Sequence, residues 1–190
     1  RGFDSYFGML GCCFDKFKHT KNYITDTHSN MEKDYTAGTD ADYYLTFGTY
    51  MWENEAKKVV HAHNVTDADA PLFLMVSFDA PHAQVIVPQD YLGTPDHDEG
   101  VLGAGYDMRL AFAANMRLVD NAIKGIVKQI DVRGMLDNTV IAVTSDNGAP
   151  NIDVSSDPNG GSNWPYRGSK GTCYEGGVRV PAFVYSPLIT

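Results

Sequence analysis

Apolar residues between Thr49 and His63 recur at the spacing of one helix face, so this segment is predicted to be an amphipathic helix. Thr49 belongs to the residue types that cap helix N-termini, and Glu53 with Lys57 makes a favourable i,i+4 pair. His61 and His63 lie two positions apart and point to different sides of a helix, which argues against a shared metal ion. The apolar face comprises Trp52, Ala56, Val59, Val60 and His63.

A second, longer helix is predicted from about residue 105 to residue 130 by the same period. Asp120 lies beside its apolar stripe, and we interpret this residue as a buried acid that anchors a loop rather than as a ligand. Gly134 then ends the helical region. The stripe comprises Ala113, Met116, Val119, Ile123, Ile126, Val127 and Ile130.

Three other segments have the composition of strands. Residues 72–78 are apolar on both faces, which is typical of a central strand in a parallel or mixed sheet. A β-branched run follows at residues 139–145, and residues 180–185 form a last strand after a turn at Gly176 and Gly177. Because the first two strands are separated by the long helix, the order predicts a βαβ unit within an α/β fold.

Polar residues follow two of these predicted strands. His82 comes shortly after the first, and Asp146 and Asn147 come directly after the second. In open α/β sheets ligands bind at the carboxyl ends of the strands, and hard cations prefer carboxylate and amide oxygens. Lys170 stands among glycines, where the backbone can approach an anion closely. A metal ion and a lysine at one point predict a site for a doubly charged oxyanion ester.

Each of these signals also has a purely structural interpretation. An Asp-Asn-Gly sequence after a strand most often forms a turn, because these residues tolerate left-handed backbone conformations. A lysine near glycines is usually solvated, and a single histidine is usually structural. The combination of the signals, rather than any one of them, favours a functional site.

The region from residue 11 to residue 48 shows no firm period, and we expect loops there with a short hairpin near residues 35–46. Four of its residues are potential metal ligands, but their spacing fits no ligand pattern, so we interpret them as solvated loop residues. They are His19, Asp26, His28 and Asp34.

The chain has 190 residues and a net charge of −9. This size suits one domain with a real core, and the negative charge argues against binding to nucleic acid, which needs a basic face. No apolar stretch reaches the length of a membrane span. The first residue is Arg1 rather than Met. We therefore expect the sequence to be an internal piece of a longer chain.

Cysteines and a glycosylation sequon give weaker signals about the compartment. Cys12, Cys13 and Cys173 are an odd number, so at least one thiol has no partner within the chain. We interpret Cys173 as a small packed residue at a helix start rather than as a nucleophile. Asn64 begins an Asn-Val-Thr sequon in a polar connection, which favours glycosylation and a secreted or lysosomal protein.

Four motifs together resemble the sulfatase family. They are the segment Arg1-Gly2-Phe3-Asp4-Ser5-Tyr6-Phe7-Gly8, the strand that ends in Ala80-Pro81-His82, the strand that ends in Asp146-Asn147-Gly148, and the pair Trp164-Pro165-Tyr166-Arg167-Gly168-Ser169-Lys170 and Glu175-Gly176-Gly177-Val178-Arg179. The resemblance implies an alkaline-phosphatase-like α/β fold with a mixed, mostly parallel sheet flanked by helices. Residues 1–190 would then be part of one catalytic domain, without its N-terminal strand and its C-terminal subdomain.

The resemblance also implies a chemistry, the hydrolysis of sulfate esters of sugars or aryl groups. Sulfatases use a formylglycine, whose hydrated aldehyde attacks sulfur while Ca²⁺ holds the sulfate oxygens. By resemblance, Asp146 and Asn147 are metal ligands, Lys170 contacts the sulfate, and His82 lies near the leaving oxygen. A histidine with an ordinary pKa near 6.5 can donate a proton to that oxygen. The substrate would be a sulfated carbohydrate or an aryl sulfate. The sequence does not decide whether the protein forms a homo-oligomer.

The sequence departs from the family pattern at the nucleophile. It contains no Cys-x-Pro-x-Arg or Ser-x-Pro-x-Arg, and the closest match begins with Asn163, which cannot become an aldehyde. We therefore expect this segment alone to be inactive, with the nucleophile supplied by sequence outside it. The alternative is a sulfatase-like protein that has lost activity and serves as a structural or carbohydrate-binding component. A phosphatase or phosphonate hydrolase of the same superfamily fits the motifs less well.

Overall fold

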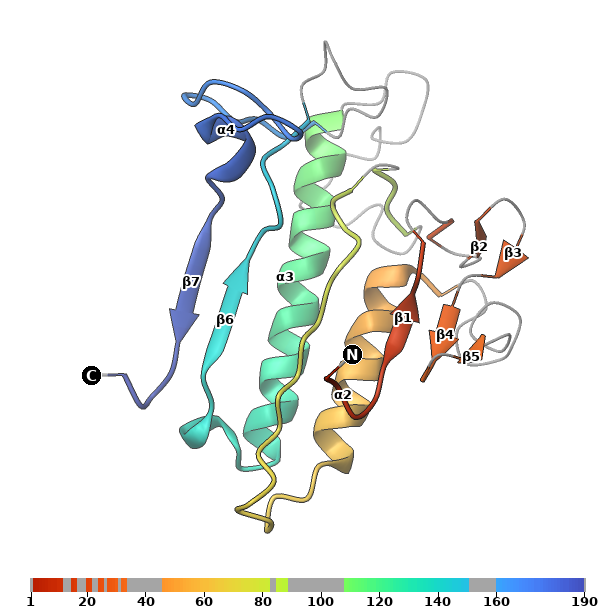
Figure 1. Ribbon diagram of the computed structural model, residues 1–190, viewed down its shortest axis with the longest axis vertical. Coiled ribbons are helices and arrows are strands. Elements are labelled where there is room, and N and C mark those ends of the chain that lie inside the picture. Colours follow the sequence, from red (N-terminus) through yellow and green to blue (C-terminus); the bar gives the residue numbers. More distant parts are fainter. Residues whose placement is uncertain are drawn as a thin grey trace.

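The computed structural model places two helices beside a set of extended segments (Figure 1). It describes residues 2–11, 15–16, 20–21, 24–25, 27–30, 32–33, 46–82, 85–88, 108–150 and 160–189. The elements are β1 (Phe7–Met9), β2 (Thr20–Lys21), β3 (Ile24–Thr25), β4 (Thr27–Ser29), β5 (Glu32–Lys33), α2 (Gly48–Ala62), α3 (Met108–Val132), the 3-10 helix η2 (Leu136–Asn138), β6 (Ile141–Thr144), α4 (Glu175–Val178) and β7 (Ala182–Tyr185).

The chain direction agrees with the predicted strand–helix–strand order. The extended segment 71–82 and β6 both run towards the upper end of the molecule in Figure 1, whereas α3 between them in sequence runs the opposite way. β7 pairs antiparallel with β6, so that Ile141 lies opposite Tyr185 and Thr144 opposite Ala182. The ends of segment 71–82 and of β6 therefore lie at the same end of the molecule.

The predicted central strand at residues 72–78 is covered on one side. Val76 and Phe78 pack against the buried side chains of α2, whereas Phe73 and Met75 are 77% and 66% exposed. The prediction of a central strand was wrong for the described part of the chain, because residues 72–78 are not a strand and pair with none of its strands. The apolar character of both faces is as the sequence analysis noted, but only one face is buried within the described part of the chain.

Helix α2 confirms most of the first prediction. It begins at Gly48 and ends at Ala62, and it buries Trp52, Ala56 and Val60. The predicted Glu53–Lys57 pair forms, with 2.9 Å between Oε1 and Nζ. The prediction for Thr49 was wrong, because Phe47 holds the N-cap position and no side chain caps the helix; Thr49 itself is buried in the first turn.

Helix α3 is as long as predicted, but its buried face is rotated by about one residue from the predicted stripe. The predicted members Ala113 and Met116 are exposed, and the interpretation of Asp120 as a buried acid was wrong because this residue is exposed too. The error arose because half of the true face consists of alanines and a further position is an asparagine, and a search for large apolar residues passes over both. The buried residues are Ala111, Ala114, Asn115, Leu118, Ala122 and Ile126.

The core forms where α2 packs against α3. One cluster joins Phe47 at the start of α2 to Val87 and to Ala114 and Leu118 of α3. At the other end of the helices, the Arg133 guanidinium donates a hydrogen bond to the His63 carbonyl oxygen at 3.0 Å. This packing fixes the helix pair on which segment 71–82 rests.

Short antiparallel strands make up the rest of the N-terminal region. β4 pairs with both β1 and β5, and β2 pairs with β3. Two hydrogen bonds between Tyr6 and Asn30 extend the β1–β4 pair. The Tyr6 N–H donates to the Asn30 side-chain oxygen, and the Asn30 N–H donates to the Tyr6 carbonyl oxygen. The hairpin predicted near residues 35–46 lies outside the described residues, apart from its last residue.

The C-terminal elements are shorter than predicted. The strand expected from residue 139 begins at Ile141, because η2 occupies residues 136–138, and the last strand begins at Ala182. The expected turn at Gly176 and Gly177 is instead the buried part of the one-turn helix α4. Gly134 has a φ of 68°, as expected of a glycine that ends a helical region. Within the described residues, no helix has the length and apolarity that a membrane crossing requires.

Candidate functional site

Asp146 and Asn147 lie in the turn that follows β6. Asp146 is exposed, and Asn147 is half-buried. The side-chain nitrogen Nδ2 of Asn147 donates to the Gly148 backbone carbonyl oxygen at 3.0 Å. The Ser145 hydroxyl donates to the backbone carbonyl oxygen of Asn147 at 3.2 Å. Both contacts fix the turn and leave the side-chain oxygens of Asp146 and Asn147 without a hydrogen-bond donor in the described part of the chain.

Lys170 is tied to this turn through the backbone. Its N–H donates to the Ala149 carbonyl oxygen at 3.0 Å. Asn163 reinforces the connection, because its Oδ1 accepts from Ala149 N–H at 2.7 Å and its Nδ2 donates to the Ala149 carbonyl oxygen at 2.8 Å. Lys170 is exposed, and its ammonium pairs with no carboxylate of the described residues. The structure therefore joins the backbone of the predicted lysine to the loop that follows the predicted metal ligands, and a meeting of their side chains stays a prediction.

Glycines allow the backbones of this region to approach one another. Gly148 N–H donates to the Gly177 carbonyl oxygen at 3.1 Å, and a Cβ at Gly148 would overlap the Gly176 carbonyl oxygen. A Cβ at Gly176 would in turn overlap the carbonyl oxygen of Gly168. The Asp146–Asn147 turn, the Lys170 loop and α4 are thus joined by main-chain contacts that leave no room for side chains.

His82 closes the turn at the end of segment 71–82. Its N–H donates to the Asp79 carbonyl oxygen at 2.9 Å, and its own carbonyl oxygen accepts from the Lys16 ammonium at 3.1 Å. The residue itself is exposed. Segment 71–82 and β6 both end towards the upper end of the molecule (Figure 1), whereas a shared site of His82 with Asp146 and Asn147 stays a prediction.

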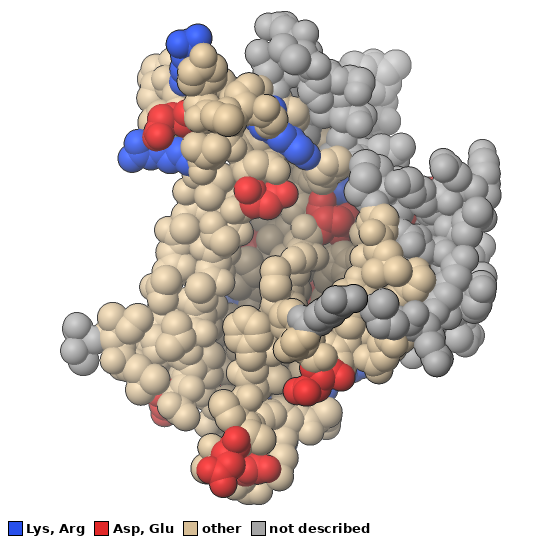
Figure 2. Space-filling view, in the orientation of Figure 1, with Lys and Arg blue, Asp and Glu red and all other residues tan. Residues whose placement is uncertain are grey.

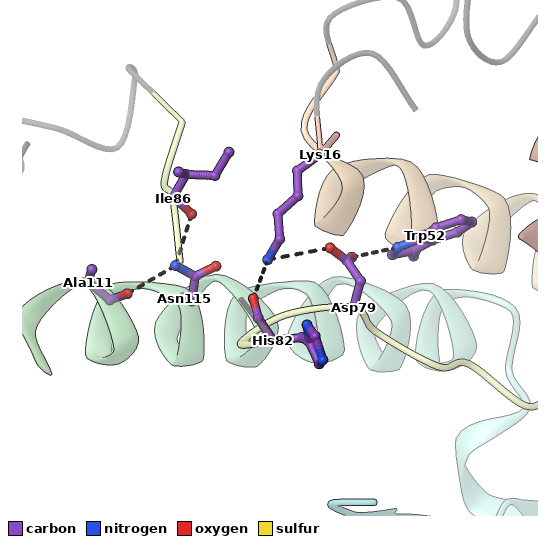
Figure 3. A network of polar contacts seen from close by, with 7 residues as sticks. All are labelled: Lys16, Trp52, Asp79, His82, Ile86, Ala111 and Asn115. Atoms are coloured by element: carbon purple, nitrogen blue, oxygen red, sulfur yellow. Dashed lines mark hydrogen bonds and ion pairs between the residues drawn. The ribbon is translucent and has the colours of Figure 1, made fainter. Parts of the chain in front are cut away.

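A buried ion pair lies beneath the His82 turn (Figure 3). The Lys16 ammonium stands 3.5 Å from Asp79 Oδ2, and the Trp52 indole N–H donates to Asp79 Oδ1 at 2.8 Å. Burial lowers the pKa of Lys16, although the neighbouring Asp79 carboxylate acts in the opposite direction. Three elements that are distant in sequence thus meet at the base of this turn.

Asn115 holds the chain on the other side of His82. It is fully buried on α3, and its Nδ2 donates to the Ile86 carbonyl oxygen at 2.9 Å and to the Ala111 carbonyl oxygen at 3.0 Å (Figure 3). A buried amide that bonds to an irregular backbone replaces the hydrogen bonds that the segment would otherwise lack. The His82 turn is therefore anchored before and after the histidine.

The chemistry of Asp146 and Asn147 suits a hard cation such as Ca²⁺, which takes carboxylate and amide oxygens. Their side-chain oxygens receive no hydrogen bond from the described residues, so both are available as ligands. Calcium takes six to eight oxygens, and these two residues supply only part of such a set. Among the described residues, no group of three or more His, Cys, Asp or Glu side chains gathers in a way that would hold a metal.

Three further predictions from the sequence can be compared with the structure. Asn64 is exposed just after α2, and its Oδ1 accepts from the Thr66 hydroxyl at 2.8 Å, so the sequon is accessible as expected. Cys173 was expected to be packed, but it is an exposed free thiol two residues before α4. Of the four loop residues that were interpreted as solvated, only His28 is described, and it is partly buried.

Four residues that shape this edge were not identified from the sequence as contributors to it: Lys16, Asp79, Asn115 and Asn163. Asp79 carried a usable signal, because an acid at the end of an apolar strand is unusual. Asn115 carried another, since it interrupts an alanine-rich helix face. Lys16 carried none, because it lies in a polar region without a period.

Comparisons with known proteins agree on one family. The Sulfatase family model matches residues 2–190. Arylsulfatase J of Mus musculus is 32% identical over 196 residues, covering 100% of this chain and 29% of its own length. N-acetylgalactosamine-6-sulfatase of Canis lupus familiaris is 30% identical over 195 residues, covering 98% of this chain and 33% of its own length.

A solved structure extends the comparison to the fold. Ps i-CgsB in complex with k-i-k-neocarrahexaose superposes with a TM-score of 0.75 and 25% identity, covering 99% of this chain and 40% of that protein. This likeness confirms the predicted α/β architecture. The chain spans about a third of the length of the curated relatives named above.

Proposed function

Because the chain belongs to the sulfatase family, we propose that it is part of the catalytic domain of a sulfuric ester hydrolase. In this proposal Asp146 and Asn147 are metal ligands, Lys170 binds the sulfate group, and His82 acts at the leaving oxygen. The enzymatic names of the relatives favour this function over an inactive structural protein. The formylglycine nucleophile would come from sequence outside residues 1–190.

Exposed apolar residues support the view that further sequence completes this domain. Phe73 and Met75 on segment 71–82 are largely exposed, as are Phe183 and Val184 on β7. Large exposed apolar patches on a folded domain normally mark surfaces that another part of the protein or a partner covers. Since the curated relatives are about three times longer, we propose that other parts of the same domain cover it.

The observation that carries the proposal is the joining of Lys170 to the Asp146–Asn147 turn. The Lys170–Ala149 hydrogen bond and the side-chain contacts of Asn163 hold the backbone of the Lys170 loop against the residue that follows the Asp146–Asn147–Gly148 turn. This supports a proposal in which the Lys170 ammonium acts beside the Asp146 and Asn147 oxygens. A lysine provides a point charge that suits a tetrahedral anion in several orientations. Figure 2 shows that Lys and Arg side chains gather at this upper end on the face in view, over the region of α4.

In the proposal, each residue has a separate role in the cleavage of the S–O bond. A bound divalent cation would supply positive charge to the sulfate oxygens. Lys170 would hold the sulfate group in place and stabilise negative charge as it develops. His82 would donate a proton to the bridging oxygen, so that the alcohol or phenol leaves uncharged. None of these residues supplies the nucleophile.

We propose a sulfated carbohydrate as the substrate class, with simple aryl sulfates as artificial substrates. Two observations support it. One relative is named for an amino-sugar sulfate, and the solved structure is in complex with k-i-k-neocarrahexaose.

The exposed sequon at Asn64 supports passage through the secretory route to a secreted or lysosomal location. A fall in mass after enzymatic removal of N-glycans, absent in Asn64→Gln, would support the latter point.

The activity is tested with the full-length protein and with the isolated 190-residue chain, using 4-nitrocatechol sulfate. We expect metal-dependent turnover by the full-length protein and none by the isolated chain. Asp146→Asn should raise the metal concentration that is needed for half-maximal turnover, and Lys170→Met should raise KM. Turnover by the isolated chain would contradict the assignment of the nucleophile, and no turnover by the full-length protein would favour the inactive alternative.

The role of His82 is tested by the choice of leaving group. Phenol is a poorer leaving group than 4-nitrophenol. Hydrolysis of phenyl sulfate therefore depends more on a proton donor than hydrolysis of 4-nitrophenyl sulfate does. We expect His82→Gln to reduce kcat for phenyl sulfate by about 100-fold or more and for 4-nitrophenyl sulfate by clearly less. Equal losses for the two substrates would show that His82 does not act as the proton donor.

A further inference from the structure

The buried Lys16–Asp79 pair has no part in the chemistry proposed above. The side chain of Lys16 is 3% exposed and that of Asp79 is 12% exposed. Buried ion pairs are often no more stabilising than apolar residues of the same volume, because both charges lose their hydration. A pair kept in such a place, directly under the proposed proton donor, suggests a role other than general stability.

Lys16 contacts both ends of the turn that carries His82. Its ammonium stands 3.5 Å from Asp79 Oδ2 and 3.1 Å from the His82 carbonyl oxygen. The turn between these residues is closed by the 2.9 Å bond from His82 N–H to the Asp79 carbonyl oxygen. One buried cation therefore holds the first and the last residue of the turn together (Figure 3).

Helix α2 holds both members of the pair in place. Trp52 of this helix donates to Asp79 Oδ1, and Gly48 N–H donates to the Lys16 carbonyl oxygen at 2.8 Å. The Asp79 carboxylate lies against the first turn of the helix, since a Cβ at Gly48 would stand 3.2 Å from Oδ1. A carboxylate is favoured there by the positive end of the helix dipole. The pair is thus rigid relative to the core.

We propose that Lys16 and Asp79 are positioning residues that hold the His82 turn and thereby orient the imidazole at the sulfate ester. This inference rests on the proposed role of His82. Neither residue touches the substrate in this proposal. A proton donor must lie within hydrogen-bond reach of the leaving oxygen, and a displacement of about 1 Å can lower the rate about 100-fold.

The test uses the full-length protein and a double-mutant cycle between the pair and His82. Lys16→Met with Asp79→Asn removes both charges together, so neither is left buried without a partner. We expect this double variant to lower kcat for phenyl sulfate about 10- to 100-fold with little change in KM. In a His82→Gln background the same two substitutions should cause no further loss, because the pair acts only through His82.

Lys58→Met is the matched control. Lys58 lies on α2, the helix that contacts the pair, and forms an ion pair with Glu55 at 2.8 Å, but its side chain is 58% exposed. It should leave kcat unchanged in both backgrounds. If the double variant at residues 16 and 79 lowers kcat by the same factor in the His82→Gln background, the pair acts through overall folding and the inference is overturned. If His82→Gln alone leaves kcat unchanged, the inference and the role of His82 both fail, whereas the Asp146 and Lys170 variants still test the sulfatase function.

A second measurement does not depend on activity. In protein labelled with carbon-13 at histidine Cε1, the His82 resonance is identified by its loss in His82→Gln. We expect this resonance to shift or broaden in the double variant and to stay unchanged in Lys58→Met. An unchanged His82 resonance in a folded double variant would contradict the inference.

Discussion

The two halves of the candidate site are held in place by different means. The His82 turn depends on side chains from distant elements, chiefly the Lys16–Asp79 pair and Asn115. The Asp146–Asn147 turn and the Lys170 loop depend on main-chain hydrogen bonds between glycine-rich segments, and Asn163 adds a side-chain bridge between them. The first half should therefore respond to changes of charge and the second to changes of volume.

This difference explains why the sequence revealed one half better than the other. Main-chain contacts between glycines require a local motif at fixed spacing, and such a motif can be read directly. A side-chain clamp requires only that three residues meet after folding, so nothing in the local sequence marks it. Lys16 lies 63 positions before Asp79 in the numbering and has no periodic pattern around it.

The largest effect is expected from breaking the buried pair on one side only. Asp79→Asn leaves the Lys16 ammonium buried without a counter-charge, and we expect it to lower stability by about 3–5 kcal/mol. Lys16→Met with Asp79→Asn should recover most of this loss, because both charges are gone. Thermal unfolding of the full-length variants measures both effects. A double variant no more stable than Asp79→Asn would show that the charge imbalance is not the cause.

The half that contains the Asp146–Asn147 turn and the Lys170 loop should be sensitive to an added methyl group. Gly148→Ala places a Cβ against the Gly176 carbonyl oxygen, and we expect a loss of about 1–3 kcal/mol together with a large fall in kcat/KM. Gly134→Ala is the control, because its φ is 68° but nothing lies within 4 Å of the added Cβ. It should cost about 1–2 kcal/mol through backbone strain and leave the kinetics unchanged. Equal kinetic losses in the two variants would refute the volume argument.

Asn163 sharpens the comparison, because its side chain bridges the two loops of the half that is otherwise joined by main-chain contacts. Asn163→Ala removes three hydrogen bonds, two to Ala149 and one to Gly168, and should cost about 1–2 kcal/mol. KM should rise, since Lys170 is then held less firmly. Asn121→Ala, an exposed substitution on α3, should stay within about 0.5 kcal/mol. An unchanged KM in Asn163→Ala would show that this bridge does not position Lys170.

The smallest effect is a difference in pH dependence. Burial lowers the pKa of Lys16 in the folded protein, so the unfolded chain binds more protons between that pKa and the ordinary lysine value of about 10.4. Stability therefore gains with rising pH across this window in the wild type, and Lys16→Met lacks this gain. The difference in thermal midpoint between the two proteins should change in favour of the wild type as the pH rises towards the ordinary lysine value. A constant difference would contradict the lowered pKa.

Much of the fold followed from the sequence, and the exceptions have physical reasons. The bounds of α2 and the Glu53–Lys57 pair were predicted because local spacing decides both. The buried face of α3 was misplaced because three alanines and Asn115 hold four of its six buried positions, and a search for large apolar residues passes over them. The predicted site residues His82, Asp146, Asn147 and Lys170 remain proposals. Their motifs could be identified, but the contacts of their side chains with substrate depend on groups that no local pattern specifies.

The most direct test of the account is a crystal structure of the full-length protein with a bound sulfate ester. We expect the Lys170 ammonium and the His82 imidazole to contact the same sulfate group, with Asp146 and Asn147 oxygens coordinating a cation beside it. The imidazole should lie within hydrogen-bond distance of the bridging oxygen. A structure in which His82 and Lys170 point away from each other, or in which the sulfate binds elsewhere, would contradict the account.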